Sequence, residues 1–277
     1  MNALSNAILS DIFIYPVKSL AGIRVSNWSV TDKGLLHDRK WMLIDSNNKF
    51  LSQRSHPKMT LIKTQIKDDQ LILSTSTTGS VSLPLNPDNG TAIETSIWSD
   101  QCIAKTTSQQ ASQWLTDFLG IECQIVYQPD EIIRPVDPDF AKSTDKVYFS
   151  DGFPFLICSQ ASLATLNQSL DIQIPIQRFR PNLVIANCDS YAEDSWRKIT
   201  INNITFRLPK PCSRCSVPSI DCDTAETNKE PLIALNKARR WNNHIYFGQN
   251  ALHDNTGELV VGNPVQINRT GSNQPPL

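Results

Sequence analysis

The chain has 277 residues, of which 26 are basic, 27 are acidic and 40% are hydrophobic. A chain of this length buries roughly 70 to 75% of its unfolded surface, in one large domain or two ordinary ones. The formal net charge of -1 gives no overall attraction to nucleic acid or anionic membranes, and neither a signal-peptide pattern nor a run of about 18 apolar residues is present. We therefore expect a cytoplasmic protein that binds any anion through a local cluster of basic residues.

The first hundred residues predict mainly β-strands. An apolar stretch, ILSDIFIYPV, comes first, and two apolar runs in KWMLIDSNNKFLSQ are separated by the turn residues SNN. The segment MTLIKTQIKDDQLILSTSTTGSVSLPL holds three apolar runs broken at KDDQ and TTGS, which is typical of an antiparallel meander. The pattern predicts a small β-rich domain over residues 1–105.

Three helices are predicted in the remainder of the chain. In SQQASQWLTDFLG the apolar residues recur with a helical period, Ser108 stands where an N-cap is expected, and Gly120 follows the end. A second helix is predicted in SQASLATLNQSL with Ser159 as its cap, and a third begins at Pro231 in EPLIALNKARRW.

Strands are expected between and after these helices. They are NLVIAN at 182–187, the pair in KITINNITFRL with Asn202 and Asn203 at the turn, and LVVGNPVQI. The whole pattern predicts an α+β fold, predominantly β, with a β-barrel core and peripheral helices in a second domain over residues 106–267. The polar, proline-rich residues 268–277 are predicted to form a flexible tail.

Cys212 and Cys215 stand three apart in PCSRCSVPSID, and four interpretations are open from the residues alone. A disulfide, half of a zinc site, a redox dithiol, and two partly buried thiols without a chemical role all fit the spacing. A zinc site lacks a second compact pair, since only Cys222, His244 and His253 are nearby. A redox dithiol lacks the following helix that would lower the pKa of its first thiol.

Basic residues in short, non-helical settings form a second group. They are Lys18 in YPVKS, Arg39 in HDRKW, Arg54 in SQR and Arg180 in RFRPN. Each alone is typical of a solvated surface, but together they have the chemistry of a phosphate site. Because neither GxxxxGK[ST] nor GxGxxG is present, a phosphate ligand other than an ordinary nucleotide is favoured.

Several motifs in matching order resemble one known family. They are IYPVKS, HDRKWMLID, SDGFPFLICSQASLATLN, FRPNLVI, CDSYAEDSW, CSRCSVPSID and GELVVGNPV, spread over about residues 9–267. This combination resembles the MOSC-domain family with its N-terminal β-barrel domain, which includes the mitochondrial amidoxime reducing component and bacterial relatives that detoxify N-hydroxylated bases. The resemblance implies a MOSC β-barrel core, a smaller β-rich N-terminal domain, and a molybdenum cofactor between them.

The resemblance also implies roles for individual residues. Cys215 is expected to supply a thiolate to molybdenum, with Arg214 beside it favouring that thiolate, while Cys212 has no assigned role. The residues expected to bind the pterin and its phosphate are Lys18, Ser19, Arg39, Arg180 and Asn182, with Ser150 and Asp151 nearby and Arg54 in the cationic cluster.

The implied activity is reduction of N-hydroxylated compounds (amidoximes, hydroxylamines and N-hydroxylated purines) to the N–H form and water. Asp221 and Asp223 are candidates for a proton relay, although turn-forming carboxylates are an equal alternative. The chain lacks the CxxxxCxxC set of a ferredoxin-like domain, so a separate ferredoxin-like or flavin reductase partner is expected to supply electrons. A cofactor or sulfur carrier without substrate turnover is the alternative function, and a structural or redox-sensing β-protein is a third.

Overall fold

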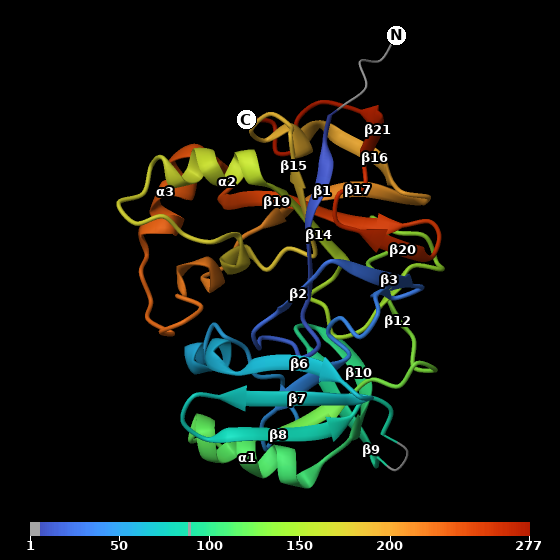
Figure 1. Ribbon diagram of the computed structural model, residues 1–277, viewed down its shortest axis with the longest axis vertical. Coiled ribbons are helices and arrows are strands. Elements are labelled where there is room, and N and C mark those ends of the chain that lie inside the picture. Colours follow the sequence, from blue (N-terminus) through green and yellow to red (C-terminus); the bar gives the residue numbers. More distant parts are fainter. Residues whose placement is uncertain (1–5, 88–89) are drawn as a thin grey trace.

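The structure is a computed structural model that describes residues 6–87 and 90–277, arranged in two lobes (Figure 1). Residues 1–5 and 88–89, which belong to the predicted first domain, lie outside the described residues. Strands dominate both lobes, and the α-helices of the described chain pack against them. The predicted α+β class with a predominance of β is therefore confirmed.

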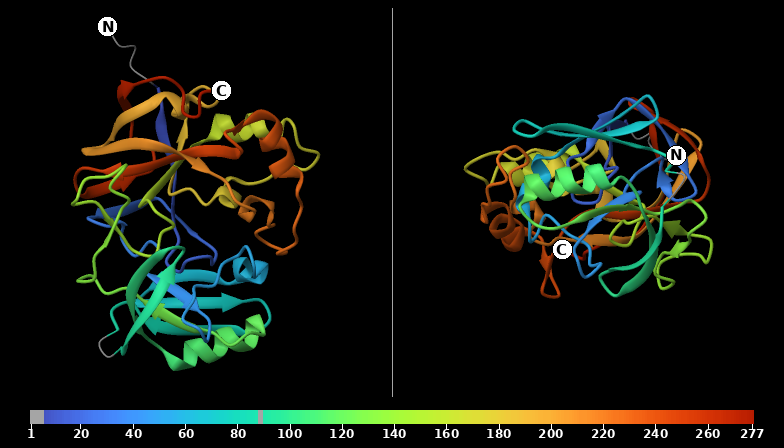
Figure 2. Two further views of the ribbon diagram at one scale, coloured as in Figure 1. Left: turned by 180° about the vertical axis from the view of Figure 1, so that it is seen from behind. Right: turned by 90° about the horizontal axis from the view of Figure 1, so that it is seen from below.

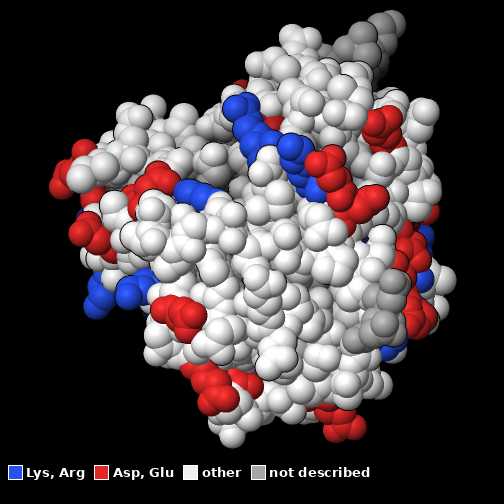
Figure 3. All heavy atoms as spheres, turned by 60° about the horizontal axis from the view of Figure 1, so that its bottom comes forward, with Lys and Arg blue, Asp and Glu red and all other residues white. Residues whose placement is uncertain are grey.

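The first lobe, which is the lower one in Figure 1, contains the predicted meander. Its strands are β6 (Lys63–Lys67), β7 (Gln70–Thr75) and β8 (Gly79–Pro84). Asp68 and Asp69 connect β6 to β7 with φ of 49° and 58°. Two positive φ values suit a two-residue hairpin turn, a conformation that aspartate tolerates. Figure 3 shows charged side chains in small, separated groups on this side of the molecule.

A four-stranded sheet and one helix complete the first lobe. The sheet runs β5 (Trp41–Ile44), β11 (Gln124–Tyr127), β10 (Asp100–Thr106) and β9 (Ala92–Ile97). Helix α1 (Gln109–Leu119) is capped as predicted, since the Ser108 hydroxyl accepts a hydrogen bond from the Ala111 amide and Gly120 is left-handed with φ of 72°. Because α1 packs on β8 and β11, this lobe extends to Tyr127 and includes α1, which the prediction had placed in the second domain.

The second lobe is built on a sheet of nine strands among the described residues. In order they are β2 (Ile23–Val25), β1 (Ile8–Ile14), β15 (Leu183–Ala186), β14 (Phe155–Ser159), β19 (His244–His253), β17 (Ile204–Ser213), β16 (Trp196–Ile201) and β21 (Val265–Thr270), with β18 (Arg240–Trp241) beside β19. Strand β1 comes from the start of the chain, yet it pairs antiparallel with β15. The N-terminal segment thus belongs partly to each lobe.

Smaller elements cover this sheet. They are the strands β3 (Asn27–Thr31), β4 (Gly34–Leu35) and β20 (Gly257–Val260), the pair β12 (Arg134–Pro135) and β13 (Lys146–Val147), and helices α2 (Gln160–Asn167) and α3 (Glu230–Ala238). The predicted Ser159 cap, Pro231 in the first turn of α3, and Asn202 at the β16 to β17 turn with φ of 53° are all present. Strands β14 and β19 were not predicted.

The last residues contact the second lobe. The Gly271 amide donates to the Ser195 carbonyl at 2.8 Å, the Gln274 amide donates to the Asp194 carbonyl at 2.9 Å, and Pro275 is buried. The residues predicted as a flexible tail therefore lie along the lobe in the structure.

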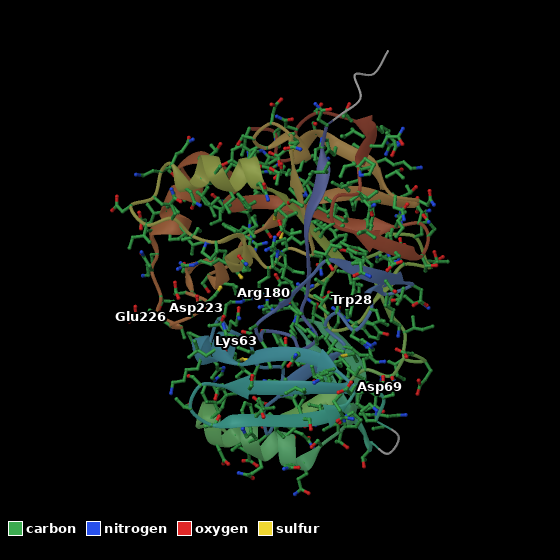
Figure 4. All side chains as sticks on the ribbon, in the orientation of Figure 1. Trp28, Lys63, Asp69, Arg180, Asp223 and Glu226 are labelled. Atoms are coloured by element: carbon green, nitrogen blue, oxygen red, sulfur yellow. The ribbon has the colours of Figure 1, made fainter. Side chains whose placement is uncertain are left out.

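A segment of the second lobe reaches down to the first. It follows the short 3₁₀-helix Val217–Ser219, and the view from behind in Figure 2 shows it descending beside the gap between the lobes. Lys63 on β6 faces Asp223 in this segment, with 3.2 Å between Nζ and Oδ1, and Arg180 lies above Lys63 in the view of Figure 4. The Arg180 Nη1 also donates to the Leu20 carbonyl at 2.7 Å. Polar contacts thus join the lobes around one central region.

Candidate functional site

An inner cavity of about 150 Å³ lies in this central region, with walls from both lobes. It brings together every residue that the sequence analysis assigned to cofactor binding, although their roles stay predictions. Those residues are Lys18, Ser19, Arg39, Arg54, Ser150, Asp151, Arg180, Asn182 and Cys215. Lys18 and Cys215 are 197 positions apart in the sequence and line one cavity only because of the fold.

Three of these wall residues have left-handed backbone conformations. The φ values are 69° at Ser19, 53° at Arg39 and 56° at Arg180. Residues other than glycine adopt positive φ uncommonly, and such residues cluster at functional sites where the surrounding structure holds them. The short, non-helical settings seen in the sequence correspond to these tight backbone bends.

Arg39 and Arg180 both lie over the ring of Tyr15, with guanidinium carbons 4.4 and 4.2 Å from the ring centroid. Arg39 is paired, because its Nη1 donates to Asp38 Oδ2 at 2.5 Å and to Asn182 Oδ1 at 3.0 Å. The Nη2 of Arg180 is buried and has no hydrogen-bond partner among the residues that the structure describes. Burial and the positive charge of Arg39 lower the pKa of Arg180 to about 10.

Lys18 also lines the inner cavity and has partners of its own. Its Nζ donates to the Phe149 carbonyl at 2.9 Å and to Asp151 Oδ1 at 2.5 Å. Burial lowers the pKa of Lys18, and Asp151 opposes this effect. Although burial acts to raise the pKa of Asp151, the charge and hydrogen bond of Lys18, together with a hydrogen bond from Trp98, bring it well below its usual range.

The wall of the inner cavity is strongly cationic. Its described lining residues include five basic side chains and one acidic side chain, namely Lys18, Arg39, Arg54, Arg180 and Arg214 against Asp151. A cavity of low dielectric constant strengthens the field of these charges relative to water. An unsatisfied buried guanidinium N–H in such a wall favours an anionic ligand, and a phosphate matches that donor geometry.

Cys212 lies near the end of β17 and Cys215 follows the end of that strand, and both line the inner cavity. All seven cysteines, which lie within the described ranges, are free thiols, so the disulfide interpretation does not apply to the structure. Arg214 was expected to support the Cys215 thiolate, but its Nη1 donates to the Cys212 sulfur at 2.9 Å and its Nη2 to the Phe179 carbonyl. Burial acts to lower the pKa of Arg214, and the neighbouring Cys212, Cys158 and Cys215 raise it above its usual value.

The two carboxylates proposed as proton relays lie away from the cavity. Asp221 accepts hydrogen bonds from the amides of Asp223 and Thr224 at 2.9 and 3.0 Å, and its Oδ2 pairs with Arg178 at 2.5 Å. These hydrogen bonds, the Asp223 amide first, lower the pKa of Asp221. Asp221 therefore has the geometry of a turn-forming carboxylate.

An outer cleft of about 1130 Å³ adjoins the inner cavity. The two share a wall made of Trp98, Asp151, Gly152, Phe153, Cys212 and Asn250. Trp98 was missed in the sequence, where WSD carries no glycine or asparagine to mark a tight turn. A bulky residue at a hairpin tip is recognisable as a site residue only once the hairpin is known.

Neither a cluster of metal ligands nor a membrane-crossing helix is found in the described residues. No group of three or more histidine, cysteine, aspartate or glutamate side chains is arranged to hold a metal ion in the part of the chain that the structure describes. None of the helices in residues 6–87 and 90–277 is long and apolar enough to cross a membrane.

Comparisons with known proteins cover most of this chain. Residues 6–122 match the family model described as the MOSC N-terminal beta barrel domain, and residues 144–266 match the one described as the MOSC domain. The chain is 32% identical to the mitochondrial amidoxime-reducing component 1 of Homo sapiens, over 94% of this chain and 82% of that protein. It is 31% identical to the molybdenum cofactor sulfurase of Danio rerio, over 90% of this chain but only 32% of that protein. The crystal structure of the YUAD protein from Bacillus subtilis aligns over 94% of this chain with 9% identity and a TM-score of 0.46.

Proposed function

Because the chain belongs to the MOSC family, in which a MOSC N-terminal domain precedes a MOSC domain, we propose that it is a molybdenum-cofactor-dependent oxidoreductase. Its proposed substrates are N-hydroxylated compounds (amidoximes, hydroxylamines and N-hydroxylated purines), which it reduces to the N–H form and water. One observation carries the proposal: a cysteine sulfur and a cationic wall share one cavity beside a much larger cleft, and an Arg180 N–H in that wall has no partner among the described residues.

The residues of the inner cavity fit the molybdenum cofactor in charge and in donor type. The buried Arg180 Nη2 and the excess of basic side chains suit its phosphate, and a thiol suits a soft metal bound through sulfur. Because Cys215 and the basic residues line this one cavity, the phosphate and the metal of the cofactor would both be bound here.

The chain's own residues would divide the binding between them. Arg180 would bind the phosphate through its guanidinium, whose Nη2 has no partner in residues 6–87 and 90–277, and Arg39, fixed by Asp38 and Asn182, would keep Arg180 in place through the Arg180 carbonyl. Ser19 and Ser150 would supply hydroxyl groups at the wall. Cys215 would be the protein ligand of the metal, and Cys212, whose sulfur accepts from Arg214, would not.

The reaction consumes two electrons and two protons for each N–O bond that breaks, and it gives one N–H product and one water. When bound, the cofactor would supply the two electrons and accept the oxygen. The outer cleft would hold the substrate with its N–O group toward the shared wall. Since Asp221 is paired with Arg178 and has a lowered pKa, we assign proton delivery to water in the outer cleft.

A separate protein is proposed as the electron donor, either a ferredoxin-like protein or a flavin reductase. The cytoplasm is the proposed compartment. The carrier alternative draws support from the similarity to the molybdenum cofactor sulfurase of Danio rerio. The large outer cleft favours the enzyme, because a carrier has no need to seat a substrate.

The test is a turnover assay on protein produced in a host that makes the cofactor. Benzamidoxime and a strong chemical reductant are supplied, and release of benzamidine is followed by chromatography. The enzyme proposal predicts benzamidine from wild type and none from Cys215→Ala. A fully loaded wild-type sample that leaves benzamidoxime intact would favour the carrier.

A further inference from the structure

Trp98 has an unusual backbone position for its size. Ile97 pairs with Asp100 at the end of the β9 to β10 hairpin, so Trp98 and Ser99 form a two-residue connection. Trp98 has φ of 55°, in a turn position where glycine, asparagine and aspartate are usual. A bulky side chain in this conformation is strained and persists where the surroundings hold it, often at functional sites.

The surroundings do hold the Trp98 side chain. The Arg54 guanidinium lies over the indole at 4.1 Å, Phe50 contacts it edge to face at 4.7 Å, and Nε1 donates to Asp151 Oδ1 at 3.1 Å. Even so, 46% of the residue is exposed. The indole is therefore fixed in orientation and still presents a large apolar surface.

That surface lies at the junction of the inner cavity and the outer cleft, since Trp98 lines both. Asp151, which accepts the Trp98 Nε1 hydrogen bond, also binds Lys18 in the inner wall. A substrate whose N–O group faces the inner cavity would thus have its remaining atoms beside the indole. A planar ring is the group that gains most from such a contact.

The outer cleft has the opposite charge balance to the inner cavity. Among its described lining residues are four carboxylates and two basic groups: Glu94, Asp100, Asp137 and Asp151 against Arg134 and Lys210. Arg134 is buried and already bonded to Asp100 at 2.6 Å and to the carbonyls of Tyr148 and Ser150. The Lys210 Nζ lies over the ring of Phe140 at 4.3 Å. Since Asp100 is paired with Arg134 and Asp151 with Lys18, the remaining charges are Glu94 and Asp137 against Lys210, and a negatively charged substrate would meet a net negative wall here.

We propose, resting on the proposed function, that Trp98 is a specificity-determining residue of this site. It selects N-hydroxylated substrates with a planar ring, and the acidic outer cleft rejects those that carry a negative charge. The ring packs against the exposed indole, which positions the N–O group at the shared wall.

The test compares three probes with the cofactor-loaded protein: benzamidoxime, the aliphatic acetamidoxime, and 4-carboxybenzamidoxime. Trp98→Asn removes the ring but keeps a residue that tolerates the backbone conformation. It should lower the kcat/KM ratio of benzamidoxime to acetamidoxime about 5- to 10-fold, as expected for one ring contact. Wild type should show a higher KM for 4-carboxybenzamidoxime than for benzamidoxime, and salt should reduce this difference.

Two controls make the outcomes distinct. Trp241→Asn removes another exposed tryptophan, which lines neither described cavity, and should leave the ratio unchanged. Trp98→Phe should retain most of the ring preference. An unchanged ratio in Trp98→Asn with normal molybdenum and pterin content would overturn the inference.

If wild type reduces none of the probes, the proposed function fails. Calorimetric binding of benzamidine to wild type and to Trp98→Asn then still decides the role of Trp98. Binding about 5- to 10-fold weaker in Trp98→Asn supports that role, and equal binding overturns it.

Discussion

Replacing Arg180 with methionine tests the phosphate site most sharply. Burial lowers the pKa of Arg180 from 12.5 to about 10, which corresponds to a cost of about 3 kcal/mol for keeping its charge in the cavity. A charge-assisted hydrogen bond from the free Nη2 to an anion contributes about 1.5 to 3 kcal/mol. Arg180→Met should therefore weaken cofactor affinity by a factor of about 10 to 150. The cofactor-free protein should lose little stability, because a buried charge without a full set of partners has been removed.

The assay measures molybdenum and pterin content after dialysis, together with the melting temperature of the cofactor-free protein. Arg178→Met is the matched control, because it removes a guanidinium two residues away that pairs with Asp221 and does not line either described cavity. It should retain the cofactor. Equal cofactor content in wild type and Arg180→Met would refute the assignment of Arg180 to the phosphate.

Three further outcomes are expected. Lys18→Met should weaken cofactor retention less than Arg180→Met does, because Lys18 already has Asp151 and the Phe149 carbonyl as partners. An NMR titration of this variant should show the pKa of Asp151 rising toward its usual value. A greater loss of cofactor than in Arg180→Met would contradict this ranking. Burial and Lys40 lower the pKa of His37 to about 4. The stability linked to neutral His37 is therefore present above about pH 6.5 and is lost as the pH falls to 4, by no more than about 3 kcal/mol. Urea unfolding of His37→Asn should show a weaker pH dependence of stability over this range, and a pH dependence identical to that of wild type would refute the assignment. Gly248→Ala should lower the free energy of unfolding by roughly 2 to 4 kcal/mol, since its new Cβ would lie 2.6 Å from the Cys158 sulfur at a φ of 78°. Gly120→Ala is the control, because Gly120 has a similar φ and no described atom within 4 Å of the new Cβ, and it should lower the free energy of unfolding less. Equal losses in urea unfolding would show that the close contact at Gly248 relaxes.

The local elements of the fold were predictable from the sequence because their signals are local. Ser108 and Gly120 bound α1, and Asp68 and Asp69 form the turn of the meander. The pairing of β1 with β15 joins residues about 170 positions apart and leaves no local pattern. Strand β14 is buried throughout, so it lacks the alternation that marks a strand, and β19 contains Gly248 and the buried Gln249, which interrupt its apolar run.

The residues of the candidate site were predictable from the sequence, but the contacts between their side chains were not. Short motifs selected the basic residues and Cys215, and the structure brings them into one cavity. The partner of each side chain depends on the tertiary fold: Arg214 contacts Cys212 rather than Cys215, and Asp221 turns toward Arg178. Trp98 needed the hairpin geometry, because its importance comes from a backbone conformation that its residue type does not favour.

The inequality of the two neighbouring cysteines is the central claim, and metal analysis tests it directly. Wild type, Cys212→Ala and Cys215→Ala are purified from a host that makes the cofactor, and molybdenum, zinc and pterin are measured per chain. We predict stoichiometric molybdenum in wild type and in Cys212→Ala, and its loss in Cys215→Ala. Zinc in place of molybdenum, or molybdenum lost from Cys212→Ala and kept in Cys215→Ala, would contradict the proposed site.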